Sequence, residues 1–334
     1  MRDYIIRRLL ILIPVMIGVS LLTFALFNII PGDACVLRLG FGSTPETLHD
    51  CREQHGLNRP LFPITVNSDL PVIHLQESQY GGWLWDIIAH QDLGESLAEG
   101  GARVSTELER RLPITLELMI VTIIFALLLG IIPGMVSAIR PNTPIDWVAR
   151  VVSVLWLSIP SFYLAILMIT FGLLWFGWTP PQFGTGYVPF YEDPWINFQQ
   201  FFFPALVLSV GIAAVIMRLT RSAMLEVLRN DYIRTAWSKG LRERTVVWRH
   251  ALKNALIPVV TLIGLQIGAL IGGAVIIESV YNLNGVGKYT LEAIIRRDLF
   301  VVQSLTLMFA AVYVLCNLMV DVAYAWLDPR IHYN

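Results

Sequence analysis

Six long runs of apolar residues, uncharged except for Glu117 in the second, constrain this chain more than any other feature of its sequence. A bilayer core about 30 Å thick needs roughly 20 apolar residues per helix, and each run is long enough to cross it. The 334 residues are 55% hydrophobic and only 15% charged, and the mean hydropathy is +0.62. We therefore predict an all-α integral membrane protein with six transmembrane helices, rather than a soluble protein with six buried ones. The predicted spans are residues 9–30, 114–139, 151–176, 198–217, 255–277 and 299–320.

The predicted spans divide the chain into three parts. Residues 1–30 hold the N-terminal tail and the first span, residues 31–113 form an external loop region, and residues 114–334 form a core with five spans. The first run has 22 residues, which exceeds the roughly 7–15 of a signal-peptide core. We therefore expect it to be a retained helix.

Basic residues predict which side of the membrane each loop faces. Short cytoplasmic loops are enriched in Lys and Arg. Residues 218–254 carry nine of them and the N-terminal tail carries three arginines, whereas residues 177–197 carry none. We therefore expect a multi-pass protein with both termini and residues 218–254 in the cytoplasm, and with residues 31–113 and 177–197 outside.

The position of ionisable residues tests whether the chain powers transport by itself. Charged groups near the bilayer centre are costly and mark ion or proton relays. Glu117 and Glu278 lie near the predicted outer ends of their helices, and Asp321 lies near the inner end of the sixth. This distribution disfavours an ion-coupled transporter. An intramembrane enzyme is disfavoured as well, because the six histidines all lie outside the predicted spans.

The stretch Gly285-Val-Gly-Lys288 imitates only the end of a phosphate-binding loop. Residue 282, where that motif requires its first glycine, is Asn, and Lys288 is followed by Tyr289 rather than Ser or Thr. We predict that the chain has no catalytic residues, binds no cofactor or metal, and has no nucleic-acid partner. Any energy for transport should come from a separate cytoplasmic subunit.

Residues 218–254 mix apolar residues with the basic ones. This pattern predicts short amphipathic helices broken at Gly240. A basic interfacial loop held near anionic lipid is the alternative.

The order of residues in this segment resembles the Glu-Ala-Ala loop of binding-protein-dependent ABC importer permeases. Arg234, Thr235 and Ala236 occupy the Glu-Ala-Ala positions, Gly240 the position of the family's Gly, and Pro258 that of its closing Pro. The long spacing from Gly240 to Pro258 is similar to the dipeptide, oligopeptide and nickel branch (DppB/OppB-like). The resemblance implies that the helix around Arg234 is a coupling helix that seats in a groove of the ATPase.

Residue chemistry fits these implied roles. Gly240 permits a tight reversal, the small Ala236 would let a partner approach closely, and Pro258 suits the first turn of a helix. The implied coupling residues are Asp231, Tyr232, Arg234, Thr235, Ala236, Gly240, Leu241, Glu243 and Pro258.

The resemblance extends over most of the chain. Stretches similar to that branch occur in the same order as in the family: Ile30-Pro-Gly-Asp33, Gly56-Leu-Asn-Arg-Pro60, Asp92-Leu-Gly-Glu-Ser96, Arg111-Leu-Pro-Ile-Thr-Leu116 and Leu327-Asp-Pro-Arg330. Residues 61–80 fit less well and look like an insertion, which either tunes contact with a binding protein or is passive.

The resemblance implies a MetI-like permease fold in the bacterial cytoplasmic membrane, surrounded by lipid. It also implies three kinds of protein partner: a second homologous permease in a heterodimer, one or two ABC ATPases that use ATP and Mg, and an extracytoplasmic solute-binding protein. The expected function is translocation of short peptides by alternating access. Import of nickel or another small solute is the alternative.

Polar residues in the spans are candidates for the translocation path. Gln266 lies nearest the middle of the fifth predicted helix, and Ser158 and Ser161 flank Pro160 in the third. Each could contact solute. Equally, Gln266 could bridge helices, and the serines could satisfy backbone groups freed by Pro160.

Two further features concern packing and the external loop. Glycines at 264, 268 and 272 form one stripe on the fifth helix, where another helix can approach closely. Cys35 and Cys51 share the external loop and are a candidate disulfide, with two free thiols as the alternative.

Overall fold

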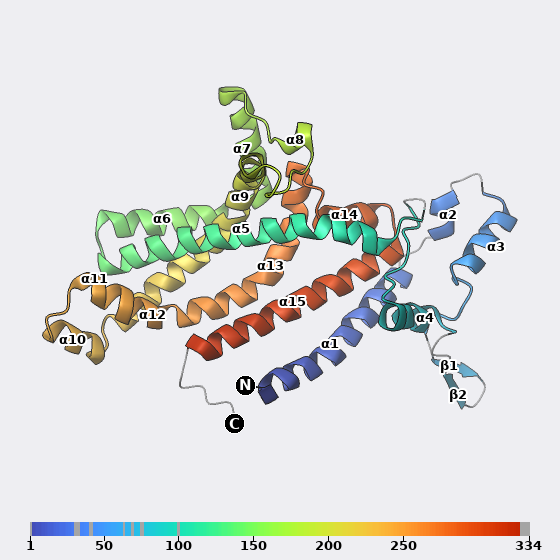
Figure 1. The fold of residues 1–334 in the computed structure, drawn as a ribbon, viewed down its shortest axis with the longest axis horizontal. Helices are drawn as coiled ribbons and strands as arrows, with labels where there is room; N and C mark the ends of the chain where they lie inside the picture. The colour runs from blue at the N-terminus through green and yellow to red at the C-terminus, as the bar shows by residue number, and fades with distance from the viewer. Residues whose placement is uncertain are drawn as a thin grey trace. The chain divides into compact units, whose positions relative to one another are not determined.

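The chain folds into helices that group into two compact units (Figure 1). The core unit comprises Pro113–Lys288 and Tyr313–Asn334, and the N-terminal unit comprises Arg2–Leu112 and Tyr289–Val312. The computed structural model describes residues 2–29, 34–39, 43–62, 64–67, 70–73, 77–98 and 101–327. Of the family-like stretches, residues 30–33 and 328–330 lie outside these ranges, as does the side chain of Asp321.

Aromatic side chains hold the N-terminal unit together. Phe24, Tyr80 and Trp83 form a buried cluster, and the hydroxyls of Ser20 and Tyr80 lie 2.8 Å apart in a hydrogen bond. The first and fourth helices are therefore packed against each other. The elements of this unit, besides parts of longer helices, are α1 (Arg2–Ile29), α2 (Ala34–Leu39), α3 (Pro45–Gln54), α4 (Gln79–Trp85), the π-helical turn η1 (Asp86–His90) and most of α14 (Val286–Ile295).

A short β-hairpin in the N-terminal unit corrects the prediction of a purely helical chain. Strands β1 (Ile64–Asn67) and β2 (Leu70–Ile73) pair antiparallel, with Ile64 opposite Ile73. Both strands lie within residues 61–80, the segment that looks like an insertion. Their β-branched residues favour extended structure, but strands this short leave little signal in a sequence dominated by apolar helices.

Helix α5 (Val104–Ile139) covers the second predicted span and crosses α9 (Pro194–Val227) at very close range. A Cβ atom on Gly130 would lie 2.6 Å from the side chain of Ile216, and one on Gly134 would lie 2.6 Å from the carbonyl oxygen of Met217. This is the Gly-x-x-x-Gly spacing that lets helix backbones approach in membranes.

The third predicted span, residues 151–176, is not one continuous helix. It is divided between α6 (Pro144–Ser158) and α7 (Ser161–Phe176), which are bent by 99° relative to each other. Ile159 and Pro160 between them have extended backbone, with ψ of 120° and 135°. Because proline lacks an N–H and disfavours helical geometry at the preceding residue, the helix ends here. The helix is therefore completely broken at Pro160.

Among the described residues, four helices are long and apolar enough to cross a membrane alone: α5, α9, α13 (Ile257–Tyr281) and α15 (Leu299–Leu327), the last over Leu299–Val320. The bent pair α6–α7 would make a fifth span. Within the described side chains, α1 contributes a shorter apolar segment, Leu10–Leu26. Length and composition therefore support four or five of the six predicted spans.

The fourth predicted span is too short, because α9 continues past residue 217 to Val227. The first ten residues of the predicted loop 218–254 are therefore helical, and that loop begins at Leu228. The basic residues of the α9 extension had suggested a loop, but Met224 and neighbouring apolar side chains are buried against other elements. Burial of these apolar side chains keeps residues 218–227 helical, although this segment is less apolar than the span before it.

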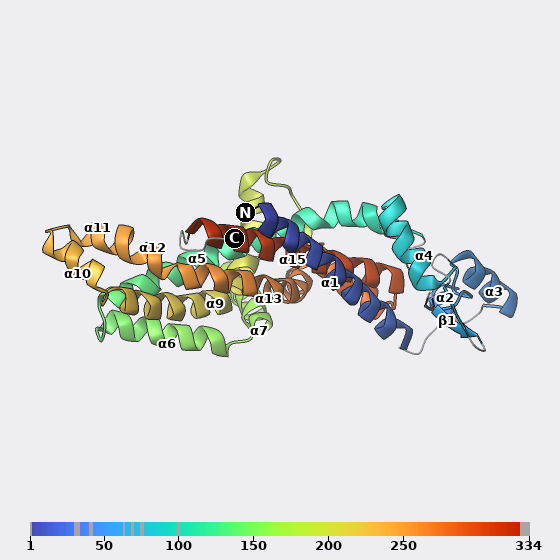
Figure 2. The same ribbon diagram turned by 90° about the horizontal axis from the view of Figure 1, so that it is seen from below.

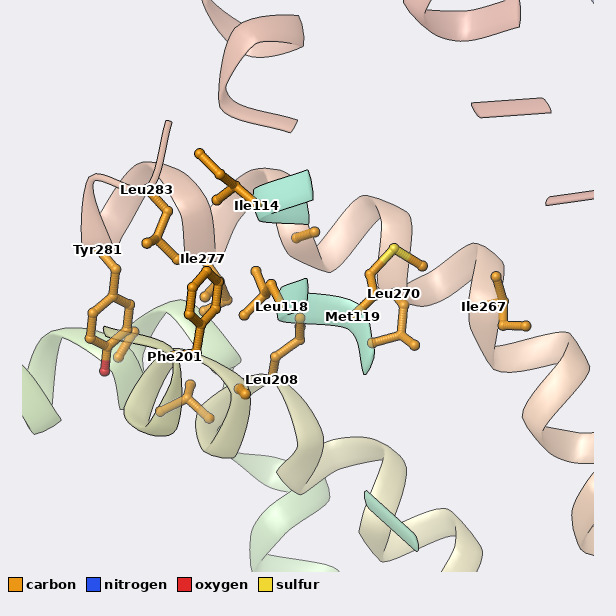
Figure 3. Close-up of a cluster of buried hydrophobic side chains, with 14 residues drawn as sticks. Ile114, Leu118, Met119, Phe201, Leu208, Ile267, Leu270, Ile277, Tyr281 and Leu283 are labelled. Atoms are coloured by element: carbon orange, nitrogen blue, oxygen red, sulfur yellow. The ribbon is translucent and has the colours of Figure 1, made fainter. Parts of the chain in front are cut away.

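Helices α5, α9 and α13 meet in the main apolar cluster of the core unit (Figure 3). Leu118 of α5 lies among side chains of α9 and α13, including Phe201 and Ile277. Helix α9 also packs along α6, beside which it runs in Figure 2. Helix α9 is thus the central helix of this unit.

The glycine stripe of α13 packs within the chain at two of its three positions. A Cβ on Gly264 would lie 2.9 Å from Val320, and one on Gly268 would lie 3.1 Å from Tyr313, both on α15. At Gly272 a Cβ would have nothing within 4 Å. The first two glycines therefore serve the contact between α13 and α15.

Candidate functional site

A small helical lobe, residues 231–255, extends from one end of the core unit, next to the ends of α5, α6 and α9 (Figure 1). It contains the implied coupling residues except Pro258. Its elements are α10 (Asp231–Ser238), α11 (Glu243–Thr245), the π-helical turn η2 (Val246–Ala251) and α12 (Leu252–Ala255).

The lobe reverses direction at Gly240, which confirms the predicted break between two short helices. Gly240 has φ of +72°, a conformation that side chains disfavour. Its N–H donates to the carbonyl of Trp237 at 2.9 Å. A Cβ at Gly240 would meet nothing within 4 Å, so glycine is required here by backbone conformation and not by space. Pro258 lies in the first turn of α13, as predicted.

One face of the lobe is buried against the transmembrane helices. Ile233, Ala236, Val246 and other lobe residues pack with Met135 of α5 and Met224 of α9. Ala236 is only 7% exposed, so its methyl group points into this contact. The small Ala236 therefore serves close packing of α10 against α5 and α9 within the chain. Residues 233 and 236 share a helix face, and that face is turned toward α5 and α9.

The opposite face of α10 is exposed and carries most of the predicted residues. Tyr232 and Trp237 are 42% and 44% exposed. Asp231 and Arg234 form an exposed ion pair with 3.5 Å between their charged atoms, which contributes little to stability. The Thr235 hydroxyl donates to the carbonyl of Asp231 within the same helix.

This exposed surface continues past the reversal. Leu241, Glu243 and Trp248 are exposed, the tryptophan by 52%. Aromatic side chains that leave half their area uncovered are typical of protein interfaces. We call the exposed residues Tyr232, Arg234, Trp237, Leu241 and Trp248 the outer face of the lobe.

A buried carboxylate lies at the same end of the core unit. Asp146, in the first turn of α6, has no exposed surface. Arg221 of α9 donates to it through two nitrogens, Nε to Oδ1 at 2.7 Å and a terminal nitrogen to Oδ2 at 3.0 Å. Such a two-pronged contact is among the strongest that side chains make.

Other donors complete this network. The hydroxyl of Ser137 on α5 donates to Oδ1 of Asp146, and the backbone N–H of Asn142 donates to Oδ2 at 2.9 Å. A terminal nitrogen of Arg150 lies 3.3 Å from the same carboxylate. We call Asp146, Arg221, Ser137, Asn142 and Arg150 the Asp146 network; it joins α5, α6, α9 and the turn between α5 and α6.

A second buried carboxylate, Glu278 of α13, lies near the other end of α5. The hydroxyl of Thr115 on α5 donates to it at 2.7 Å and the backbone N–H of Lys288 at 2.8 Å. The Thr115 hydroxyl in turn accepts from the N–H of Val286 at 2.8 Å. A Cβ on Gly285 would overlap the Glu278 carboxylate. The Gly285–Lys288 turn therefore wraps around a carboxylate of the same chain.

The three candidate path residues lie on separate helices. The Ser158 hydroxyl donates to the carbonyl of Val154 at 2.9 Å, within α6. Ser161 begins α7, and Gln266 is half-buried on α13. Among the described residues no hydrogen bond joins any two of these three side chains. Ser158 thus satisfies backbone of its own helix.

The candidate disulfide is present in the structure. Cys35 of α2 and Cys51 of α3 form a disulfide with 6.0 Å between their Cα atoms, and both side chains are buried. The bond ties two short helices of the N-terminal unit together.

Sequence reasoning missed both carboxylate networks. Asp146 follows Thr143 and Pro144, a pattern typical of a helix start, and this was the available signal that it would lie in a first turn. Its partner Arg221 is 75 residues away, and only helix packing brings the two together.

The chain matches two family models that together span nearly all of it. Residues 126–333 match the binding-protein-dependent transport system inner membrane component family. Residues 1–119 match the N-terminal model for membrane components of the same systems.

Curated relatives align over the full length of both chains. The chain is 38% identical to the dipeptide transport system permease protein DppB of Alkalihalophilus pseudofirmus and 36% identical to the oligopeptide transport system permease protein AppB of Bacillus subtilis. It is 35% identical to the glutathione transport system permease protein GsiC of Salmonella choleraesuis. This chain therefore belongs to the inner-membrane permease family of binding-protein-dependent transport systems.

Proposed function

We propose that this chain is a permease subunit of an ATP-driven importer that carries short peptides across the bacterial cytoplasmic membrane. The observation that carries the proposal is the full-length similarity to permeases whose names all specify peptides: dipeptides, oligopeptides and glutathione. Import of nickel complexes by the same route has no comparable support among these relatives.

The proposed topology has six spans and places both termini in the cytoplasm. The spans are α1, α5, the broken pair α6–α7, α9, α13 and α15. Helix α1, with 28 residues, is long enough to cross a core of about 30 Å. The nine basic residues of segment 218–254 favour a cytoplasmic position for the lobe and the Asp146 network.

The outer face of the lobe is the proposed seat of an ATPase subunit. It combines exposed aromatic residues with Arg234, residue types that are enriched at protein interfaces. In this proposal the ATPase binds ATP and Mg²⁺, while this chain contributes no catalytic residue. A second homologous permease completes the pathway, and a solute-binding protein delivers the peptide on the other side.

The mechanism we propose is alternating access. Closure of the ATPases on ATP pushes the lobe, and the lobe moves the ends of α5 and α9 against which it packs. Gln266 on α13 and the break between Ser158 and Ser161 remain the candidate contacts with solute. Non-helical backbone inside a membrane must be covered by protein or face water, and this supports a position of the break on the pathway or on the partner permease.

A pair of substitutions at Gly240 tests the role of the lobe. Gly240→Val should strain a backbone with φ of +72° by on the order of 1–3 kcal/mol, whereas Gly240→Asn should be tolerated because Asn adopts this conformation. In the purified complex, we expect the valine variant to lose stimulation of ATP hydrolysis by the loaded binding protein, and the asparagine variant to keep it. Both should insert into the membrane normally. Equal stimulation in both variants would count against a coupling role.

The solute can be identified directly. The binding protein purified with the complex should carry short peptides when its ligand is released and analysed by mass spectrometry. A metal chelate or a sugar in their place would refute the proposed solute class and leave the transport mechanism standing.

A further inference from the structure

The Asp146 network joins α5 and α9, which pack against the lobe, to α6, which contributes no described residue to that apolar cluster. Met135 and Ala138 on α5, and Met224 on α9, pack against the lobe. Ser137 lies between the first two in sequence, and Arg221 lies one turn before Met224. Both donate to Asp146 on α6. The network therefore continues the path from the lobe into the start of α6.

We propose that Asp146 and Arg221 are positioning residues that pass movement of the lobe to α6. This inference rests on the proposed function, since it concerns how ATP-driven movement reaches the transmembrane helices. Neither residue contacts ATP or solute in this scheme. Their part is to hold α6 to α9 while the lobe moves, so that α6 follows instead of staying behind.

The contact between Asp146 and Arg221, which we call the joint, has the chemistry needed to transmit movement between α9 and α6. Apolar packing between α6 and α9 resists separation but allows one helix to slide along the other, because dispersion contacts have little directionality. A guanidinium that grips a carboxylate with two parallel hydrogen bonds fixes both distance and orientation. The Asp146 side chain has no exposed surface and that of Arg221 is 22% exposed, so water screens the pair weakly.

Helix α6 is also built to move separately from α7. The extended residues Ile159 and Pro160 interrupt the backbone hydrogen bonds between the two helices, so a rotation of α6 need not turn α7 with it. At its other end, α6 is held by Asp146 close to its first residue, Pro144. A helix gripped at one end and hinged at the other can swing as a unit, and Ser158 at the hinge is one of the candidate path residues.

The test uses the double variant Asp146→Asn/Arg221→Gln. This variant removes both charges of the pair and leaves neutral groups of similar size. The remaining cation of the network, Arg150, is 38% exposed, so no fully buried charge is left alone. The complete complex, with both permeases, the ATPases and the binding protein, is reconstituted in liposomes. Two quantities are measured for each assembled complex: the stimulation of ATP hydrolysis by loaded binding protein, and the peptide taken up per ATP hydrolysed.

We expect the double variant to assemble and hydrolyse ATP, but to lose roughly five- to tenfold in peptide taken up per ATP, a typical size for coupling between sites. The matched control is Glu107→Gln/Arg111→Gln, which removes an ion pair of 2.8 Å in the N-terminal unit and should leave this ratio unchanged. A merely structural ion pair would instead reduce the amount of complex, with a normal ratio in what remains.

The outcomes separate this inference from the proposed function. ATP-driven peptide uptake by the wild-type complex supports the proposed function whatever the variant does. A normal uptake ratio in the double variant overturns the inference alone. If the double variant does not assemble, Arg221→Lys, which keeps the charge but loses the two-pronged grip, decides in the same assay: a reduced ratio supports the joint, and a normal ratio overturns it.

Discussion

Two buried carboxylates, Asp146 and Glu278, occupy similar positions near opposite ends of helix α5 but are held in different ways. Each accepts a hydrogen bond from a hydroxyl of α5, Ser137 for Asp146 and Thr115 for Glu278. The two hydroxyl residues are 22 positions apart, which corresponds to about 33 Å along a helix. One helix thus connects two polar networks across a distance close to the thickness of a bilayer.

The difference lies in the other donors. Asp146 also accepts from a backbone N–H, that of Asn142, but its charged partner is the side chain of Arg221, which comes from another helix and can release and rebind it. Glu278 receives the backbone N–H of Lys288 in a glycine turn, where the donor is fixed by the chain itself. This contrast leads us to assign Asp146 to a joint that transmits movement and Glu278 to an anchor that resists it.

The Glu278 site also explains the sequence Gly285-Val-Gly-Lys288. Glycine-rich turns at helix starts are good anion sites because their N–H groups converge. Here the anion is a carboxylate of the same chain, and the ammonium group of Lys288 donates to the side-chain oxygens of Asn282 and Asn284. The similarity to a phosphate-binding loop therefore reflects shared physics, with a carboxylate of the chain in the place of a phosphate.

The largest effect on stability is expected from a substitution that removes only one partner of the joint. Arg221→Gln should leave a buried Asp146 without its main cation and lower stability by about 3 kcal/mol, toward the lower end for buried pairs because Arg221 is partly exposed. Thermal unfolding of the detergent-solubilised complex measures this loss. The double variant with Asp146→Asn should be more stable than Arg221→Gln alone. The reverse order would show that the charges are not coupled.

A smaller effect is expected from disturbing the anchor. Gly285→Ala places a methyl group on the Glu278 carboxylate and should cost roughly 1–3 kcal/mol, as overpacking does. Gly211→Ala is the control, since a Cβ there meets nothing within 4 Å. The surviving Gly285→Ala complex should transport peptide at the normal ratio to ATP. A reduced ratio would mean that the Glu278 site, too, transmits movement.

The smallest effects on stability are expected from removing the hydroxyl of Thr115 or that of Ser137, both on α5. Thr115→Val removes both a donor to Glu278 and the acceptor for the Val286 N–H, and should cost roughly 1–3 kcal/mol because buried groups lose their partners. Ser137→Ala should cost less, about 1 kcal/mol, since Asp146 keeps Arg221. The midpoints of thermal unfolding rank the two variants, and a larger loss for Ser137→Ala would contradict the contrast between the networks.

Much of the architecture could be predicted from the sequence because apolar runs follow directly from the bilayer as solvent. Helices α5, α9, α13 and α15 were predicted this way, and the reversal at Gly240 followed from local backbone preferences. The complete break at Pro160 was not predicted, since composition shows where an apolar run lies but not how far it bends. The extension of α9 to Val227 was missed because its basic residues resemble those of a loop.

The candidate site was less accessible to sequence reasoning. The packing of Ala236 within the chain was not predicted, because the buried face of α10 depends on where α5 and α9 lie. The pairing of Asp146 with Arg221 depends on the crossing of α6 and α9, and no local pattern encodes it. Three residues of the outer face, Tyr232, Arg234 and Leu241, were among those that the family resemblance implied. Trp237 and Trp248 were not, and their exposure appears only in the structure.

Uptake of peptide into liposomes tests most directly whether the energy for transport comes from outside this chain. The peptide found on the binding protein is offered to two preparations: the complete complex with ATP at the ATPase side, and this chain alone with a proton or sodium gradient. We predict ATP-dependent uptake by the complete complex and none by the chain alone. Uptake driven by an ion gradient through the chain alone would contradict the account.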